Sequence, residues 1–305
     1  MAYYLGIDTS AYTTSVAVCR DGEIVANVKR LLDVPQGERG LRQSDALFAH
    51  INALPEVTES VGPHEYKAIG VSAFPRDEKG SYMPVFKAGE TVALSMGNLL
   101  GIPVHRFSHQ KGHVMAALYS AGKTELVNGR FNAFHVSGGT TEILLCDKMN
   151  VSLAGGTNDL NAGQAIDRVG VRLGLPFPSG KYLEELAACG HSPVKPKISV
   201  SGIRCNLSGL ENLAYKLLSD GSPKEDVAAF TLDFIASTLE KLTENLRKEY
   251  DLPVIYAGGV MSDSIIKERL SRFDDTYFAS PEFSSDNACG AALLAYYEEE
   301  GYFAG

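Results

Sequence analysis

Two histidines four residues apart, His109 and His113, form the pair of side chains with the clearest potential for metal chemistry. Residues at this spacing lie on one face of an α-helix, so both imidazoles can reach the same ion. Ser108 directly before the pair is a favourable N-cap, which predicts that a helix begins there. The pair could equally consist of two polar residues at a partly exposed helix start. Gln110 occupies the position of the glutamate base in an HExxH helix, which argues against a metalloprotease.

Two glycine-rich turns could bind a phosphate. One is Val136–Thr140, between two strand-like segments, and the other is Tyr256–Val260, between a strand-like segment and a predicted helix. Backbone N–H groups in such turns and at helix N-termini favour anions. Each turn also has a purely structural explanation, because Gly-Gly is a favoured hairpin turn and glycine suits a tight strand-to-helix connection.

Two carboxylates could take part in this chemistry. An acid near a glycine-rich turn, such as Asp167, can accept hydrogen bonds from ribose hydroxyls. Pairing of Asp167 with Arg168 or Arg172 is the simpler alternative. Asp286 precedes the C-terminal helix, where an aspartate is often an N-cap and could also supply a carboxylate to a metal.

The composition, with 45% hydrophobic residues, is typical of a soluble globular protein. The length of 305 residues is enough for two ordinary domains or one large one. The net charge of −9 argues against a dedicated nucleic-acid binder with a broad basic face, but leaves a local basic patch open. Five scattered cysteines without a CxxC motif predict reduced thiols and a cytoplasmic location. We recognise no signal peptide and no apolar run of ~20 residues, and therefore expect no membrane association.

The elements that must position these residues alternate between strands and helices, which predicts an α/β fold. Three short apolar runs at the start predict a β-meander. In the first predicted helix, Leu47, Phe48 and Ile51 share one apolar face. The segment Phe131–Leu145 echoes the first two strand-like runs, and this weak repeat suggests two similar halves. The main predicted helices are Gln43–Leu54, Glu90–Leu100, Asn161–Leu173, Gly180–Ala188, Asp226–Tyr250 and Asn287–Glu300.

Taken together and in this order, the motifs resemble the TsaD family, the tRNA threonylcarbamoyladenosine synthase subunit formerly classed as an O-sialoglycoprotein endopeptidase. The resemblance covers nearly the whole chain through Gly6–Ser10, the histidine pair, Val136–Thr140, Ala162–Asp167, Leu173–Pro176, Ser199–Ile203, Ala257–Val260 and Ser285–Ala288. It implies an actin-like ATPase (ASKHA) fold with a nucleotide cleft between two RNase H-like halves. We expect these halves at residues 1–105 and 106–286, with the helix in 287–305 packing back on the first.

The resemblance also implies the ligands and where they bind. Metal ligands would be His109, His113 and Asp286, for one divalent ion, Fe or Zn, with Mg as an alternative. His135 is a further candidate ligand, or else a core histidine on a strand. An adenine nucleotide (ATP, AMP or threonylcarbamoyl-AMP) would contact Ser137, Gly138, Gly139, Asp167, Gly180 and Glu184. The two turns add Thr140, Gly258 and Gly259 to these nucleotide- or substrate-binding candidates, and the family's Gly-Gly-Val loop adds Asp263.

The implied activity is transfer of a threonylcarbamoyl group from its AMP anhydride to the exocyclic amine of the tRNA adenosine next to the anticodon. TsaB-like and TsaE-like subunits would be partners, and tRNA would bind through the complex. A homodimer is a further alternative. Tyr12 and Thr13 replace the acidic pair usual in the first loop, and Asp263 replaces a usual asparagine. These departures indicate a divergent paralogue and leave the catalytic residues unknown. The alternative is a non-catalytic ASKHA module that binds nucleotide and metal as an assembly or regulatory partner.

Overall fold

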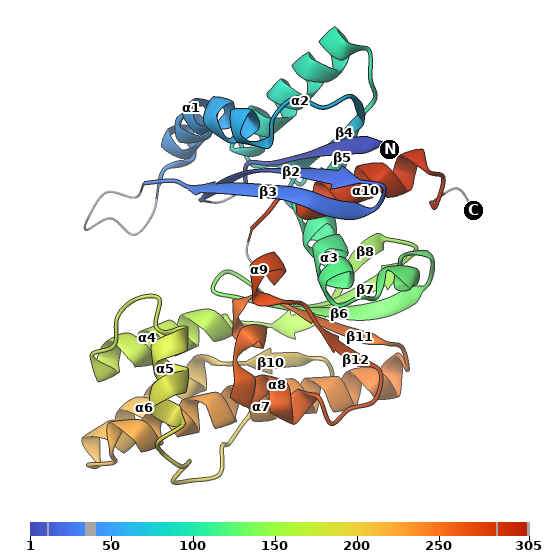
Figure 1. The fold of residues 1–305 in the computed structure, drawn as a ribbon. Coiled ribbons are helices and arrows are strands. Elements are labelled where there is room, and N and C mark those ends of the chain that lie inside the picture. Colours follow the sequence, from blue (N-terminus) through green and yellow to red (C-terminus); the bar gives the residue numbers. More distant parts are fainter. Residues whose placement is uncertain (11, 34–40, 285, 304–305) are drawn as a thin grey trace. The chain divides into compact units, whose positions relative to one another are not determined.

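A computed structural model describes residues 1–10, 12–33, 41–284 and 286–303, which form two units (Figure 1). Unit 1 contains Met1–Gly129, Lys148–Val151 and the C-terminal segment from Glu282. Unit 2 contains Arg130–Asp147 and Ser152–Pro281. The chain therefore leaves unit 1 and returns to it, so that the last helix belongs with the first strands.

Unit 1 is built on a five-stranded sheet in the order β3-β2-β1-β4-β5. The first three strands are antiparallel, which confirms the predicted meander, and β4 and β5 continue the sheet in parallel. Tight turns allow the antiparallel pairs, whereas the parallel strands require helical crossovers. The strands are β1 (Tyr3–Asp8), β2 (Thr13–Arg20), β3 (Glu23–Leu31), β4 (Tyr66–Phe74) and β5 (Val104–Ser108).

Helices cover both faces of this sheet. Helices α1 (Gln43–Val61) and α2 (Phe86–Leu100) pack on one face (Figure 1). Helix α10 (Cys289–Glu299) packs on the other face, against β1 and β4, and contacts α3 (His109–Ser120). Gly6 permits this close approach, because a Cβ there would lie 2.3 Å from the Ala288 carbonyl oxygen.

The apolar face predicted for α1 is wrong. Phe48 and Ile51 are 66% and 50% exposed, whereas Leu47 is partly buried. His50 faces the sheet instead and is fully buried, with Nδ1 2.8 Å from the Thr14 hydroxyl. A buried polar group needs such a partner, and Thr14 supplies one for Nδ1 of His50 on the buried face of the helix. The residues that α1 buries are Ala46, His50, Ala53, Leu54, Val57 and Val61.

The boundary between the units differs from the expected division after residue 105. Unit 1 continues through α3 and the short helix η1 (Thr124–Asn128) to Gly129, and it resumes at Glu282. The reason is the close packing of α3 on α10, where a Cβ on Gly290 would lie 1.9 Å from the Gly112 carbonyl oxygen. The helix that carries the histidine pair therefore belongs to unit 1 together with the C-terminal helix.

A seven-stranded sheet, in the order β12-β11-β6-β7-β8-β10-β9, forms the centre of unit 2. Strands β6 and β7 form an antiparallel hairpin, and β11 and β12 extend the sheet from β6 in parallel. The order β8-β7-β6-β11-β12 repeats that of the first sheet, which confirms the predicted internal repeat. The strands are β6 (Arg130–Val136), β7 (Thr141–Asp147), β8 (Asn150–Thr157), β9 (Ser199–Ser201), β10 (Arg204–Asn206), β11 (Val254–Ala257) and β12 (Thr276–Phe278).

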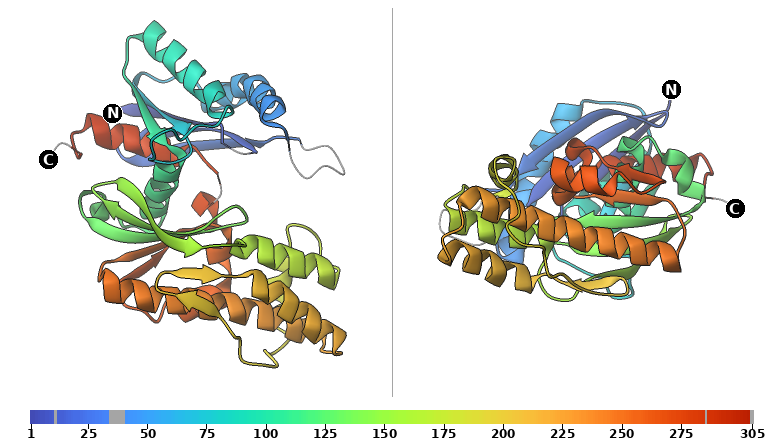
Figure 2. Two further views of the ribbon diagram at one scale, coloured as in Figure 1. Left: turned by 180° about the vertical axis from the view of Figure 1, so that it is seen from behind. Right: turned by 90° about the horizontal axis from the view of Figure 1, so that it is seen from below.

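The long helix α7 (Lys224–Glu249) supplies much of the core of unit 2 and is the long orange helix in Figure 2. Its predicted stripe, which includes Phe230, Phe234 and Leu242, is buried. The other helices of unit 2 are α4 (Ala162–Leu173), α5 (Gly180–Ala187), α6 (Ser208–Ser219), η2 (Gly259–Ser262) and α8 (Ser264–Leu270). The short helix α9 (Pro281–Ser284) begins at the last residue of unit 2 and continues into unit 1. Among the described residues, no helix combines the length and the apolar character that crossing a membrane requires.

Candidate metal centre and nucleotide pocket

The histidine pair lies at the very start of α3. The Ser108 hydroxyl accepts a hydrogen bond from the Lys111 N–H at 3.0 Å, which confirms the predicted N-cap. His109 is therefore the first residue of the helix, and His113 follows one turn later on the same face. This junction between β5 and α3 positions both imidazoles.

Three donor atoms converge at this point, and all belong to unit 1. The Nε2 atoms of His109 and His113 are 2.8 Å apart. The Oδ1 atom of Asp286 lies 3.2 Å from His113 Nε2 and 3.5 Å from His109 Nε2. With metal–ligand bonds of about 2.1 Å, neighbouring ligand atoms are about 3.0 Å apart at octahedral angles and about 3.4 Å at tetrahedral angles. The spacing of the three atoms therefore fits one divalent ion.

A fourth residue, Asp8, completes the cluster and was missed from the sequence. It ends β1, is 1% exposed, and its Oδ2 atom lies 2.8 Å from His109 Nδ1. Its Oδ1 atom accepts hydrogen bonds from the N–H and the hydroxyl of Ser10, the first at 2.8 Å. An acidic residue at the end of a fully apolar strand was the available signal, because such a carboxylate must find a partner.

The charges in the cluster are strongly coupled. Burial on its own lowers the pKa of His109, but the carboxylates of Asp8 and Asp286 raise it to about 10. Burial acts to raise the pKa of Asp286, and hydrogen bonds from the two imidazoles hold it well below its usual range. Without an ion the cluster therefore retains a proton on imidazole, which a metal would have to displace.

A separate pocket of about 340 Å³ lies within unit 2. A carboxylate from each of three segments reaches it, together with glycines from both predicted turns. Four predicted residues are not among those that line it: Ser137, Gly139 and Gly258 are neighbours of lining residues in the chain, and Thr140 lies two positions after Gly138. The sequence-predicted residues that line the pocket are Gly138, Asp167, Gly180, Glu184, Gly259 and Asp263.

In the turn between β6 and β7, some backbone N–H groups already donate hydrogen bonds to a side chain of the turn itself. The Ser137 hydroxyl accepts from the N–H groups of Gly139 and Thr140, each at 3.2 Å. The start of α4 abuts the turn, since a Cβ on Gly163 would lie 2.6 Å from the Gly138 nitrogen. Two N–H groups expected to hold a phosphate are thus already engaged, which leaves Gly138 as the turn residue that faces the pocket.

The turn after β11 explains two further residues. Gly258 has φ +101°, and a Cβ there would lie 2.2 Å from the Val136 carbonyl oxygen, so glycine is required at this position. Asp263 is the N-cap of α8 and accepts from the Ile266 N–H at 3.0 Å. Burial raises the pKa of Asp263 to about 6, with a smaller contribution from the negative charge of Glu184.

The alternative explanation for Asp167 is wrong. Arg168 pairs with Glu211 at 3.0 Å, and the Arg172 guanidinium lies 5.3 Å from the ring centre of Tyr215. Asp167 instead accepts a hydrogen bond from the Ser179 N–H at 2.7 Å, and burial raises its pKa. The carboxylate thereby fixes the start of α5 beside the pocket.

The remaining candidates have less defined surroundings. His135 lies in β6, opposite Glu142 of β7, and belongs to unit 2, so its role as a metal ligand stays a prediction. Tyr12 is 42% exposed and Thr13 is buried at the start of β2. Ala11 of the first loop and Ser285 of the motif before α10 lie outside the described residues.

Solved structures with a similar arrangement define the fold. Full-length HypF matches with a TM-score of 0.62 and 13% identity over 98% of this chain and 47% of that longer chain. Component A of the Acidaminococcus fermentans (R)-2-hydroxyglutaryl-CoA dehydratase matches with a TM-score of 0.58 and 19% identity, over 98% and 100% of the two chains. The two repeated sheets and these likenesses identify an actin-like ATPase (ASKHA) fold.

The sequence comparisons identify the family. Residues 53–293 match the family model of TsaD, tRNA N6-adenosine threonylcarbamoyltransferase, and this chain belongs to the TsaD family. The transferase of that name from Methanopyrus kandleri is 28% identical over 96% of this chain and 85% of the relative. The one from Thermus thermophilus is 29% identical over 96% and 92%.

Proposed function

We propose that this chain transfers a threonylcarbamoyl group from threonylcarbamoyl-AMP to the exocyclic amine of the tRNA adenosine next to the anticodon. Membership of the TsaD family supports this activity, and the convergence of His109, His113 and Asp286 is the observation that carries it. The amine nitrogen bonds to the carbamoyl carbon, the bond from that carbon to the phosphate oxygen breaks, and AMP leaves. The amine loses one proton in the process.

The residues of the two sites have distinct roles in this proposal. His109, His113 and Asp286 would hold one Fe or Zn ion, and such an ion supplies a Lewis acid that anchors and polarises the donor. The backbone at Gly138 and Gly259 would hold the phosphate. Asp167 and Glu184 would accept hydrogen bonds from the ribose hydroxyls.

The non-catalytic alternative rests on Tyr12 and Thr13 in place of the usual acidic pair. Full-length relatives named as the transferase favour the catalytic hypothesis. A direct test incubates the chain with tRNA, threonylcarbamoyl-AMP and TsaB-like and TsaE-like subunits, and measures the modified nucleoside by mass spectrometry. We expect product that depends on the chain. No product above background, beside an active TsaD control, would support the alternative.

The metal hypothesis has its own test. Protein purified without chelators should contain about one Fe or Zn per chain, because two imidazoles and a carboxylate suit these ions. Elemental analysis of the His109→Ala/His113→Ala double variant should show that the ion is lost. Retention of the ion by that variant would refute the assignment.

The proposed partners are TsaB-like and TsaE-like subunits in the cytoplasm, with tRNA bound through the complex.

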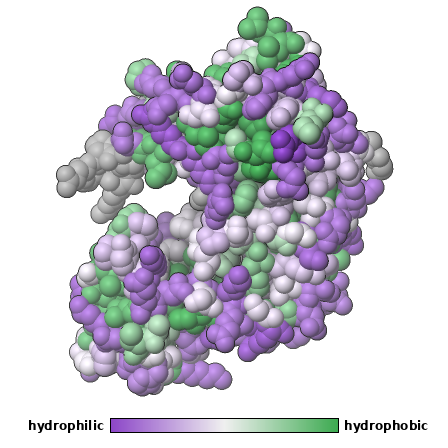
Figure 3. All heavy atoms as spheres, in the orientation of Figure 1, coloured by the Kyte–Doolittle hydropathy of each residue, from purple (hydrophilic) through white to green (hydrophobic). Residues whose placement is uncertain are grey.

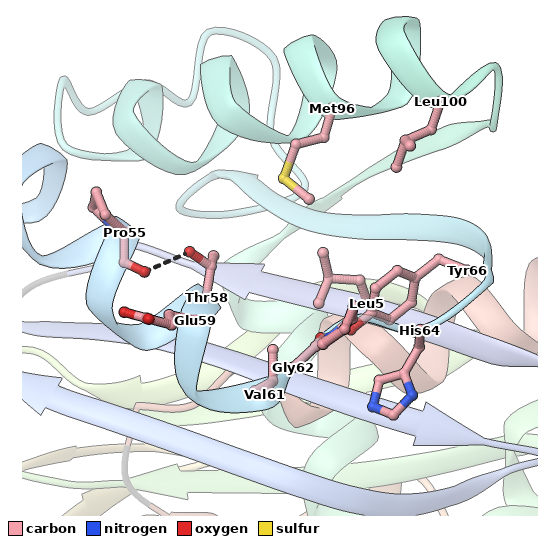
Figure 4. Close-up of a pocket in the computed structure, with 11 residues that line it drawn as sticks. Leu5, Pro55, Thr58, Glu59, Val61, Gly62, His64, Tyr66, Met96 and Leu100 are labelled. Carbon is pink, nitrogen blue, oxygen red and sulfur yellow. Dashed lines mark hydrogen bonds between the residues drawn. The ribbon is translucent and has the colours of Figure 1, made fainter.

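The outer face of α1 and α2 suits an apolar partner, because Phe48, Ile51 and Leu99 are each at least half exposed. The hydrophobic surface at the top of Figure 3 lies over the end of α2. An apolar groove of about 580 Å³ runs between the two helices, with Met96 and Leu100 facing Leu5 (Figure 4).

This larger groove differs from the two candidate sites in its chemistry. Aliphatic and aromatic side chains dominate its lining, and it lacks the converging carboxylates of the pocket in unit 2. Apolar grooves between helices accept apolar side chains from a partner. We therefore propose it as part of a protein contact surface rather than as a reaction site.

A further inference from the structure

We propose that Asp8 is a positioning residue that fixes the tautomer of His109, so that Nε2 rather than Nδ1 faces the metal. The inference rests on the proposed metal site and is independent of the transferase activity. Asp8 Oδ2 lies 2.8 Å from His109 Nδ1, on the side of the ring opposite the atom that approaches His113 and Asp286. A neutral imidazole carries one proton, and a carboxylate can only accept it. The proton is therefore held on Nδ1, and the Nε2 lone pair is available to the ion.

The surroundings of Asp8 fix the orientation of its carboxylate. Oδ1 accepts two hydrogen bonds from Ser10, one from the backbone N–H at 2.8 Å and one from the hydroxyl. Asp8 itself is 1% exposed, so the Ser10 contacts are held away from water. A backbone N–H can only donate, so the atom at the Oδ1 position must be an acceptor. The two oxygens consequently have different roles, and only Oδ2 contacts the imidazole.

This asymmetry predicts an unusual result for the isosteric change Asp8→Asn. The Ser10 N–H would hold the amide oxygen at the Oδ1 position and turn the amide NH₂ towards His109. The NH₂ group would donate to Nδ1 and leave the imidazole proton on Nε2, the atom that the ion requires. The asparagine would thus stabilise the wrong tautomer, as in the change of the buried aspartate to asparagine in a serine protease triad.

The alanine variant separates this role from a structural one. Asp8→Ala removes the acceptor without adding a donor, so His109 can adopt either tautomer. If Asp8 only fills space and satisfies buried donors, the asparagine should be nearly neutral and the alanine severe. If it sets the tautomer, Zn²⁺ affinity should fall more in Asp8→Asn than in Asp8→Ala, although asparagine is the closer match in shape. We expect a loss of about 10–100-fold for Asp8→Asn, the range for residues that orient a metal-ligating histidine.

The experiment is a Zn²⁺ titration of metal-free protein against a chromophoric chelator. It compares the wild type, Asp8→Asn, Asp8→Ala and Asp263→Asn, an equivalent change of a buried aspartate in unit 2. Circular dichroism and thermal melting establish that each variant is folded. Asp263→Asn should bind Zn²⁺ as the wild type does.

Two outcomes would overturn the inference, and they are distinguishable. If the wild type binds Zn²⁺ at the histidine pair and Asp8→Asn binds it equally well, the tautomer role is refuted while the metal site stands. If the His109→Ala/His113→Ala variant binds as the wild type does, the metal site itself is refuted. Should Asp8→Ala fail to fold, Asp8→Asn in the His109→Ala background decides instead, because the change should have no effect on residual affinity once the imidazole is absent.

Discussion

Asp263 caps a helix, but its buried carboxylate destabilises the folded state when it is ionised. Its side chain caps α8, a role that asparagine fills equally well. Burial raises the pKa of Asp263 from 3.8 to about 6, so ionisation costs the folded state free energy. That cost is absent below about pH 4, where the acid is neutral in both states, and it is complete above about pH 6.

Asp263→Asn should therefore stabilise the protein in a pH-dependent way. We expect little change at pH 4 and a gain on the order of 2 kcal/mol at pH 7.5, because the buried charge is removed and the cap is kept. Thermal melting at both pH values measures the difference. A gain of the same size at both pH values would contradict the explanation.

Asp159 provides a control, because its pKa is shifted in the opposite direction to that of Asp263. Burial by itself would raise its pKa, but hydrogen bonds from the Ser208 side chain and the backbone N–H groups of Leu207 and Leu160 lower it to about 2. The folded state therefore favours the ionised form, and this stabilisation is present above about pH 4 and lost as the pH falls through 2. Asp159→Asn should destabilise the protein at pH 7.5.

Sequence patterns predicted some of the site residues but not others. The His109/His113 pair and its Ser108 cap could be predicted, because spacing and capping are local properties of the chain. The role of Asp8 could not, because it depends on the end of β1 lying beside the start of α3, about a hundred positions later. The same holds for Asp167, whose partner is a backbone N–H rather than either neighbouring arginine.

The packing of α3 on α10 links the histidine pair to Asp286. A Cβ on Gly290 would lie 1.9 Å from the Gly112 carbonyl oxygen, so the two helices can approach only because glycine is present. Gly290→Ala should separate them, lower stability by about 1–3 kcal/mol through overpacking, and weaken Zn²⁺ binding as Asp286 shifts. Thermal melting and the chelator titration measure the two effects.

Gly209 in α6 is the matched control for this change. A Cβ there would meet nothing within 4 Å, and the residue is also helical. Gly209→Ala should leave Zn²⁺ binding unchanged and raise stability by about 0.5–1 kcal/mol, because alanine loses less conformational freedom in a helix. Equal effects of the two alanines would show that the contact between α3 and α10 does not position the ligands.

At the level of elements, periodicity predicted most helices and the opening meander. It failed for the orientation of α1. The exposed residues Phe48 and Ile51 fit the helical period as well as the buried residues of this helix do. The tertiary structure distinguishes the two faces, because it buries Leu54 and Val57 together with His50, which hydrogen-bonds to Thr14. Hydrophobic patterning alone cannot separate a core-facing stripe from an apolar surface.

For the molecule as a whole, the exposed apolar face of α1 and α2 predicts partner binding. Leu99 is 87% exposed, so Leu99→Asp should leave the melting temperature nearly unchanged. We expect the same change to weaken binding of a TsaB-like subunit at least tenfold, because it places a charge in an apolar contact. Isothermal titration calorimetry measures the affinity.

Val171→Asp is the control, since Val171 is 55% exposed on α4 in unit 2. It should leave the affinity for the subunit unchanged. If both aspartates weaken binding equally, the effect comes from net charge and the proposed face is wrong. Light scattering of the chain alone distinguishes a homodimer through the same face, which Leu99→Asp should dissociate.

The division of the chain into units could not be read from the sequence. The repeat correctly indicated two similar halves, but the helix with the histidine pair packs on the C-terminal helix and belongs to unit 1, whereas the strand that follows it in the chain begins unit 2. The family resemblance identified the fold because it rests on ordered motifs. It carried no information on which unit each connecting helix joins.

The insertion of unit 2 within unit 1 has a consequence for synthesis of the protein. The whole of unit 2 lies between His113 and Asp286 in the sequence, so the third proposed metal ligand leaves the ribosome long after the first two. Unit 2 can fold while unit 1 still lacks α10. An ion held by all three residues would close this long loop and stabilise unit 1 only in finished chains. Metal retention would then distinguish complete molecules from prematurely terminated ones.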